Sequence, residues 1–123
     1  MKINPLVDRN YLHIDILEEV FEVSELLKEI RYVVPIDDNM EPAGVVTIDD
    51  IHKHPYGNII DCDFEKPKVC PEDTLIYVLE IMQQYNLNYL PVFEQHKFIG
   101  VISLIKISQR LAELIKKAKI HIQ

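Results

Sequence analysis

VPIDDNMEPAGVVTIDDI at residues 34–51 returns 56 positions later as LPVFEQHKFIGVISLIKI at residues 90–107. The two stretches align without a gap. A proline in the second position, a glycine in the eleventh and a hydroxyl residue in the fourteenth recur in the same register. A repeat of this length indicates two copies of one supersecondary unit. The helical pattern upstream aligns better at a spacing of 55, so the copies are related but not identical.

Hydrophobic periodicity predicts the same order of elements in each copy. Helix boundaries come from turn and capping residues, such as the Thr74 that precedes an apolar helical pattern. The expected elements are a helix at 16–30, strands at 32–36 and 43–48 and a short helix at 49–53, then a strand at 68–70, a helix from 75, strands at 89–93 and 98–102 and a helix at 104–119.

These elements predict an α+β fold in which two β-α-β-β-α repeats pack about a pseudo-twofold axis, because neither small sheet can cover both of its faces alone. A chain of 123 residues suits one compact domain. We therefore expect a single domain over 1–123, with repeat 1 at about 8–53, a linker at 54–65 and repeat 2 at about 66–119.

Charge and hydropathy exclude several classes of partner. The net charge is −7, and an acidic surface disfavours general binding to nucleic acid. The acidic side chains gather in residues 1–65, which carry 15 acidic and 5 basic residues, whereas residues 66–123 carry 5 acidic and 8 basic ones. The longest uncharged apolar run, 98–105, is far shorter than the ~20 residues of a membrane helix. With no apolar leader at the N-terminus, we expect a cytoplasmic protein that does not bind membranes.

Catalytic motifs are missing from the sequence. Three glycines in the whole chain leave no Gly-rich phosphate loop, and no serine lies in a nucleophile elbow. Cys62 and Cys70 are not spaced as metal ligands or as a redox pair. His52 and His54 would point to different sides of a helix end, so we expect no metal site and no enzymatic activity.

The stretch from Gly44 to Ile51 delivers a hydroxyl, Thr47, and a carboxylate, Asp50, to the start of a helix. A hydroxyl beside free backbone N–H groups can hold a phosphate, and an ionised acid can accept both hydroxyls of a ribose. The alternative is a capping box, in which Thr47 and Asp50 only satisfy the helix's own backbone donors. On spacing alone the capping box is the commoner arrangement.

With these motifs in place, the chain resembles a tandem pair of cystathionine-beta-synthase (CBS) domains, also called a Bateman module. The resemblance covers about residues 8–117 and rests on Leu90-Pro91-Val92-Phe93, on the run from Lys97 to Ser103 and on the run from Gly44 to Ile51. It implies a regulatory module that binds an adenosine nucleotide or adenosyl compound, such as AMP, ADP, ATP or S-adenosylmethionine, and requires no cofactor.

In such pairs a site is composite, because the hydroxyl and acid of one repeat face the first strand of the other. The resemblance therefore implies one ligand site in this chain. Lys66 or Lys68 would neutralise phosphate, and Val69 and Pro91 would sandwich the adenine. The residues that the site would contain are Thr47, Asp50, Lys66, Lys68, Val69, Cys70, Asn88, Tyr89 and Pro91.

The second cleft departs from the family pattern. Ser103 keeps the hydroxyl, but Lys106 stands where the acid is expected, and an ammonium cannot accept hydrogen bonds from ribose. Its facing elements would be residues 12–14 and 32–33. We expect this cleft to be empty or to hold phosphate alone.

The resemblance also implies a homodimer that passes the ligand signal to a protein partner, which the sequence does not identify. Exposed apolar residues such as Phe21 and Ile76 favour pairing of two copies. The competing hypothesis is a ligand-free structural module that only dimerises, with Thr47 and Asp50 acting as a helix cap.

Overall fold

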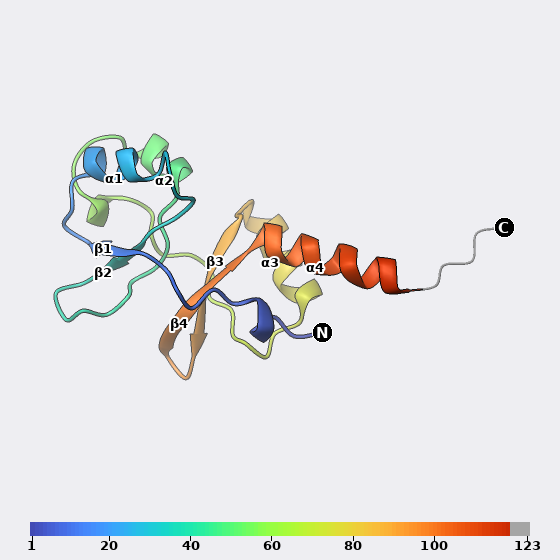
Figure 1. The fold of residues 1–123 in the computed structure, drawn as a ribbon. Coiled ribbons are helices and arrows are strands. Elements are labelled where there is room, and N and C mark those ends of the chain that lie inside the picture. Colours follow the sequence, from blue (N-terminus) through green and yellow to red (C-terminus); the bar gives the residue numbers. More distant parts are fainter. Residues whose placement is uncertain (119–123) are drawn as a thin grey trace.

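The computed structural model of the protein describes residues 1–118 and has a mixed α+β fold made of two successive halves (Figure 1). Its elements in chain order, with η for a 3₁₀ helix, are η1 (Asn4–Leu6), β1 (His13–Asp15), α1 (Val20–Leu26), β2 (Val34–Ile36), α2 (Ile48–Lys53), η2 (Ile59–Asp61), α3 (Leu75–Tyr85), β3 (Tyr89–Glu94), β4 (Lys97–Ser103) and α4 (Leu104–Lys117). The predicted α+β class is confirmed. Lys119, expected at the end of the last helix, is outside the described residues.

Each half contains the same strand pairings. In the first half β1 runs parallel to β2, with Ile14 opposite Pro35. In the second half Val69 forms the equivalent parallel bridge to Val92, and β3 pairs antiparallel with β4. The two copies found in the sequence are therefore two copies of one small sheet.

The strand predicted at 43–48 does not form as a continuous element. It is reduced to antiparallel bridges that join Val33 to Val46 and Ile36 to Pro42. Pro35 and Pro42 have no N–H to donate to a ladder, and the N–H of Val45, on the edge that faces away from Val33, donates to the carbonyl oxygen of Phe64 at 3.0 Å. The predicted strand at 68–70 is likewise a single bridge, because prolines at 67 and 71 flank it.

The first helix is shorter than its apolar periodicity predicts. Residues 16–30 were expected to be helical, but α1 spans only Val20–Leu26. Before it, the backbone N–H of Val20 donates to Gly57 O and Glu19 bridges to Asn58. Pairing with this distant segment takes the backbone groups that a longer helix would have used.

Each half takes a core residue from the segment that precedes the other half in the chain. The N-terminal segment packs on the second half, and the segment at 54–65 packs on the first. Ile3 N donates to Asp73 O, and Ile59 N donates to Glu18 O, both at 2.9 Å. Both isoleucines are fully buried, Ile3 in the core of the second half and Ile59 in the core of the first. The segment 54–65, expected to be a linker, thus supplies core residues to the first half.

Gly44 and Gly100 recur because each lies against a crossing segment of the chain, residues 54–66 at Gly44 and residues 1–8 at Gly100. A Cβ atom on Gly44 would collide with the carbonyl oxygen of Phe64, and one on Gly100 would collide with the carbonyl oxygen of Asp8. These are the carbonyls that accept the N–H groups of Val45 and Val101, at 3.0 and 2.9 Å. The repeated glycine therefore marks where the chain crosses from one half to the other.

The two halves pack against each other through their strands. Val34 and Val45 of the first half form one buried cluster with Phe98 and Val101 of the second. The rings of Tyr32 and Tyr89 meet beside it, with centroids 5.0 Å apart. This packing places the two sheets face to face at a seam, with α1 and α2 on the first half and α3 and α4 on the second (Figure 1). Across residues 1–118, every helix is too short or too polar to span a bilayer.

Candidate functional site

Thr47 and Asp50 form the first turn of α2. The backbone N–H of Thr47 donates to Asp50 Oδ2 at 2.8 Å, and Thr47 Oγ1 donates to the same oxygen at 3.2 Å. This is the capping box that the spacing indicated. One carboxylate oxygen of Asp50 is therefore used by the helix itself.

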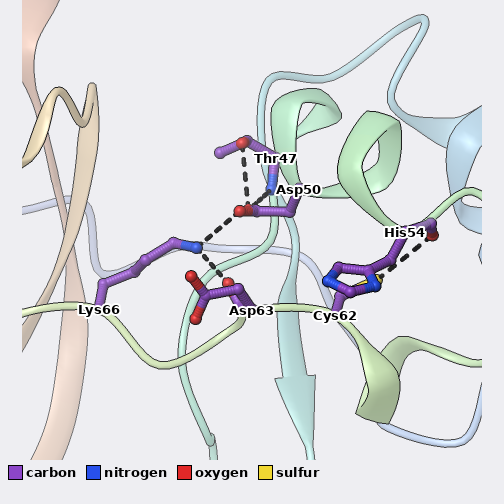
Figure 2. A network of polar contacts seen from close by, with 6 residues as sticks. All are labelled: Thr47, Asp50, His54, Cys62, Asp63 and Lys66. Carbon is purple, nitrogen blue, oxygen red and sulfur yellow. Dashed lines mark hydrogen bonds and ion pairs between the residues drawn. The ribbon is translucent and has the colours of Figure 1, made fainter.

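The other carboxylate oxygen of Asp50 is held by Lys66. Lys66 Nζ lies 2.7 Å from Asp50 Oδ1, and only 5% of the lysine side chain and 6% of the aspartate side chain are exposed. Lys66 Nζ also donates to the carbonyl oxygen of Asp63 (Figure 2). The pair is thus a buried ion pair that joins α2 to the crossing segment at residues 54–66.

A cleft of about 690 Å³ opens beside this ion pair, between α2 of the first half and the turn from α3 to β3 of the second. It brings together residues from both halves that the sequence assigned to one composite site. Its lining residues are Arg31, Thr47, Ile48, Asp49, Asp50, His52, Lys53, Lys66, Tyr85, Asn86, Leu87, Asn88 and Tyr89.

A smaller hollow of about 130 Å³ is also lined by Lys66. It contains Pro91 and Lys68, whose ammonium sits 4.5 Å from the centre of the Phe93 ring. Such a cation over an aromatic face is held by electrostatic attraction. The full lining is Ala43, Glu65, Lys66, Lys68, Pro91 and Phe93, so Lys66 is the residue that both spaces share.

Val69 and Cys70, which were expected in the ligand site, line neither of these two spaces. Val69 is 3% exposed and packs in the core of the second half. Its N–H donates to Pro91 O at 3.2 Å, and the N–H of Cys70 donates to Asp73 Oδ2 at 2.8 Å. Val69 is therefore a core residue, and the backbone N–H groups of Val69 and Cys70 are engaged within the protein.

Ser103 and Lys106 do not reproduce the arrangement around Asp50. Ser103 Oγ accepts the backbone N–H of Lys106 at 3.3 Å, which makes it the cap of α4. Lys106 lines a depression next to Met1, Leu6 and Arg110 rather than one next to residues 12–14. On the strand side of the seam, Tyr32 Oη donates to Asp8 Oδ2 at 2.5 Å.

The histidines and cysteines of this region make no metal-binding group. His54 ends α2, and His52 lines the larger cleft. No cluster of three or more potential ligands occurs among residues 1–118. Cys62 is buried beneath the site, with its Sγ 4.0 Å from the carbonyl oxygen of His54, and burial raises the pKa of its thiol above the usual value (Figure 2). A buried neutral thiol of this kind acts as a small apolar side chain.

Three cationic side chains border the larger cleft, and only Lys66 was predicted to do so from the sequence. Arg31 and Lys53 are the other two. Lys53 follows Asp50 by three residues on α2, so helical spacing would have placed it near the carboxylate. Arg31 lies between α1 and β2, and nothing in its local sequence predicts that it lines the cleft.

The sequence matches the model of the CBS domain family at residues 3–57 and again at residues 63–113. Curated proteins give no significant match. Several solved structures have a similar fold at low sequence identity.

One is an uncharacterized conserved protein from Pyrococcus horikoshii, with 18% identity, a TM-score of 0.76 and coverage of 99% of this chain and 96% of that one. Another is a CBS domain pair in complex with 5′-methylthioadenosine and S-adenosyl-L-methionine, with 16% identity, a TM-score of 0.79 and coverage of 93% and 98%. A third, CBSX2 in complex with AMP, has 22% identity, a TM-score of 0.76 and coverage of 94% and 98%.

Proposed function

Since the chain belongs to the CBS domain family, we propose that it is a regulatory module that binds one adenosine nucleotide or adenosyl compound in the cleft between its two repeats. The observation that carries this proposal is the composite lining of the cleft. Thr47 and Asp50 from the first repeat share one space with Asn88 and Tyr89 from the second, and Lys66 stands between them.

The chemistry of the cleft suits a sugar phosphate. Asp50 supplies a carboxylate that can accept hydrogen bonds from ribose hydroxyls, and Arg31, Lys53 and Lys66 supply positive charge for phosphate. Pro91 and Phe93 line the smaller hollow together with Lys66 and add an apolar surface, which suits a flat base. Proteins of the same fold have been solved with AMP and with S-adenosyl-L-methionine, which supports this class of ligand.

Regulation requires that the ligand distinguish two arrangements of the protein. A ligand shifts such an equilibrium only by its differential affinity for the two states. A site that spans the seam meets this requirement, because both repeats contact the ligand and any change in their packing changes the contacts. The signal would leave through a homodimer surface to a protein partner. Leu17 and Phe21 on the first half and Ile76 on the second are exposed apolar residues that fit such a surface.

Thermal unfolding with and without ligand tests the proposal. AMP, ADP, ATP and S-adenosylmethionine should be compared at ~1 mM, which corresponds to a binding free energy of about −4 kcal/mol at half saturation. We expect at least one of them to raise the melting temperature, and Asp50→Asn to abolish the rise. Asp38→Asn removes an exposed carboxylate that lines neither the cleft nor the smaller hollow, and it serves as the control. If no compound raises the wild-type melting temperature, the proposal is wrong.

A second function is favoured by one observation. Both oxygens of Asp50 are already satisfied, by Thr47 and by Lys66, so the site is a complete structural element without any ligand. A module that only dimerises would need nothing more. In that case Asp50 variants would lower the melting temperature, and nucleotides would leave it unchanged in every variant.

A further inference from the structure

Lys66 occupies the carboxylate that a bound ribose would use. Its ammonium holds Asp50 Oδ1 at 2.7 Å while Thr47 holds Oδ2, and both side chains of the ion pair are almost completely buried. Figure 2 shows the lysine reaching across from the crossing segment to α2. Two ribose hydroxyls cannot reach this carboxylate as long as the lysine stays on it.

The same side chain borders both spaces beside Asp50. The larger cleft holds the polar and charged residues, and the smaller hollow holds Pro91 and Phe93. Lys66 lines both of them. Moving this one side chain off Asp50 would therefore free the carboxylate and change the lining of both spaces.

Moving Lys66 leaves two buried charges without their partner. Separating a buried ion pair is strongly unfavourable unless each charge finds a replacement. Ribose hydroxyls can replace the ammonium as donors to Asp50, but they offer no negative charge to Lys66. A phosphate on the same ligand does, since an ammonium binds phosphate well as a point charge. The remaining cations at the cleft, Arg31 and Lys53, favour a phosphate there too.

Building on the proposed function, we infer that Lys66 is the residue that sets specificity for phosphorylated ligands, because it competes with ribose for Asp50 and is drawn off only by phosphate. A nucleoside without phosphate must break the ion pair and leaves Lys66 unpaired. A nucleotide exchanges one pairing for another. The site therefore discriminates between adenosine and AMP by more than the simple attraction of a lysine for a phosphate.

The test compares adenosine with AMP in the wild type and in Lys66→Met, which keeps the apolar stem and removes the charge. In the wild type we expect AMP to bind more tightly than adenosine by at least about thirtyfold. In Lys66→Met adenosine should bind at least about tenfold more tightly than it does to the wild type, because its competitor is gone, while AMP should bind more weakly. Lys66→Arg should keep the preference for AMP.

Lys97→Met controls for the loss of one positive charge, because this exposed residue lies at the start of β4 and outside both spaces. It should leave both affinities as they are in the wild type. If Lys66 only contacted the phosphate, Lys66→Met would bind AMP more weakly and would bind adenosine with the affinity of the wild type. That result would overturn the inference that Lys66 competes with ribose for Asp50. If neither ligand binds the wild type or any variant, the proposed function itself fails and this inference fails with it.

A second measurement does not depend on whether Lys66→Met folds. A crystal structure of the wild type with AMP should show Lys66 Nζ on the phosphate and Asp50 on the ribose. Persistence of the 2.7 Å contact between Lys66 and Asp50 with AMP bound in the cleft would refute the inference.

Discussion

Asp50 is both a helix cap and one half of a buried ion pair. Its spacing from Thr47 predicted the cap, and the structure contains it. The ion pair with Lys66 was not predictable in the same way, because sixteen residues separate the two and the contact forms only when the crossing segment folds back onto α2. Sequence patterns find partners within one helix turn, whereas this partner is set by tertiary packing.

Removal of Asp50 should therefore destabilise the fold by more than the loss of a cap. We expect Asp50→Ala to lower the free energy of unfolding by about 3 kcal/mol, because it leaves the Lys66 ammonium buried without a partner. Thr47→Ala, which removes only capping contacts, should cost about 1 kcal/mol. Urea unfolding of both variants measures the difference. Asp49→Ala, at an exposed neighbouring position, should lie within about 0.5 kcal/mol of the wild type.

Gly100 lies directly against the N-terminal segment. A Cβ atom here would strike the carbonyl oxygen of Asp8 and a side-chain carbon of Val7. We expect Gly100→Ala to lower the free energy of unfolding by at least about 2 kcal/mol, through overpacking against a backbone that cannot easily move. Ser108→Ala, at an exposed position of α4, is the control. Equal stability of the two variants would show that the N-terminal segment does not cross at Gly100.

At the scale of elements, the sequence predicted the second half better than the first. Ser103 was predicted to precede the last helix and caps α4, and the hairpin of β3 and β4 was expected within one residue at each end. In the first half, α1 is shorter than its periodicity indicated and the strand at 43–48 is reduced to bridges. Residues 57–59 take backbone hydrogen bonds that would extend α1 at its N-terminal end, whereas Pro35 and Pro42 have no N–H to donate to the ladder of the hairpin.

Tyr32, just before β2, contacts Asp8 of the N-terminal segment. This contact makes the association of the segment with the first half sensitive to alkaline pH. The Tyr32 hydroxyl donates to Asp8, and burial together with that carboxylate raises its pKa well above the usual value of 10.0. Because the folded state favours the neutral phenol, the stabilisation is complete below pH 10 and is lost as the pH rises beyond it.

Unfolding by urea at pH 8 and pH 11 measures this loss. We expect the wild type to lose up to about 1 kcal/mol more than Tyr32→Phe between the two pH values, a figure limited by the partial exposure of the ring. Both proteins retain Tyr11, whose pKa burial also raises, so its contribution cancels in the comparison. Identical losses in the two proteins would exclude Tyr32 as the group responsible.

At the scale of the whole molecule, the 56-residue repeat predicted two similar halves, and the structure contains them. The repeat did not predict that the N-terminal segment packs on the second half and that the segment between the repeats packs on the first. The signal was present but weak: Ile3 and Ile59 are 56 apart and both fully buried, yet the residues around them do not match. Backbone hydrogen bonds need no particular side chains, so a crossing held mainly by backbone contacts leaves little trace in the sequence.

Exposed apolar side chains on the outer surface predict that two copies of the protein pair. Phe21 on α1 is 66% exposed, which is unusual for a phenylalanine unless another surface covers it. We expect the wild type to run as a dimer in size-exclusion chromatography with light scattering, and Phe21→Glu to shift it toward the monomer. Glu22→Gln, at the next exposed position of α1, controls for the charge change. A wild type that stays monomeric at high concentration would contradict the dimer.

Binding of an adenosine nucleotide through Asp50, in the cleft between the repeats, can be measured by isothermal titration calorimetry of the wild-type protein with AMP. We expect one AMP per chain with a dissociation constant of ~1 mM or tighter, and no measurable binding to Asp50→Asn. No heat of binding at millimolar AMP, or equal binding by Asp50→Asn, would contradict it.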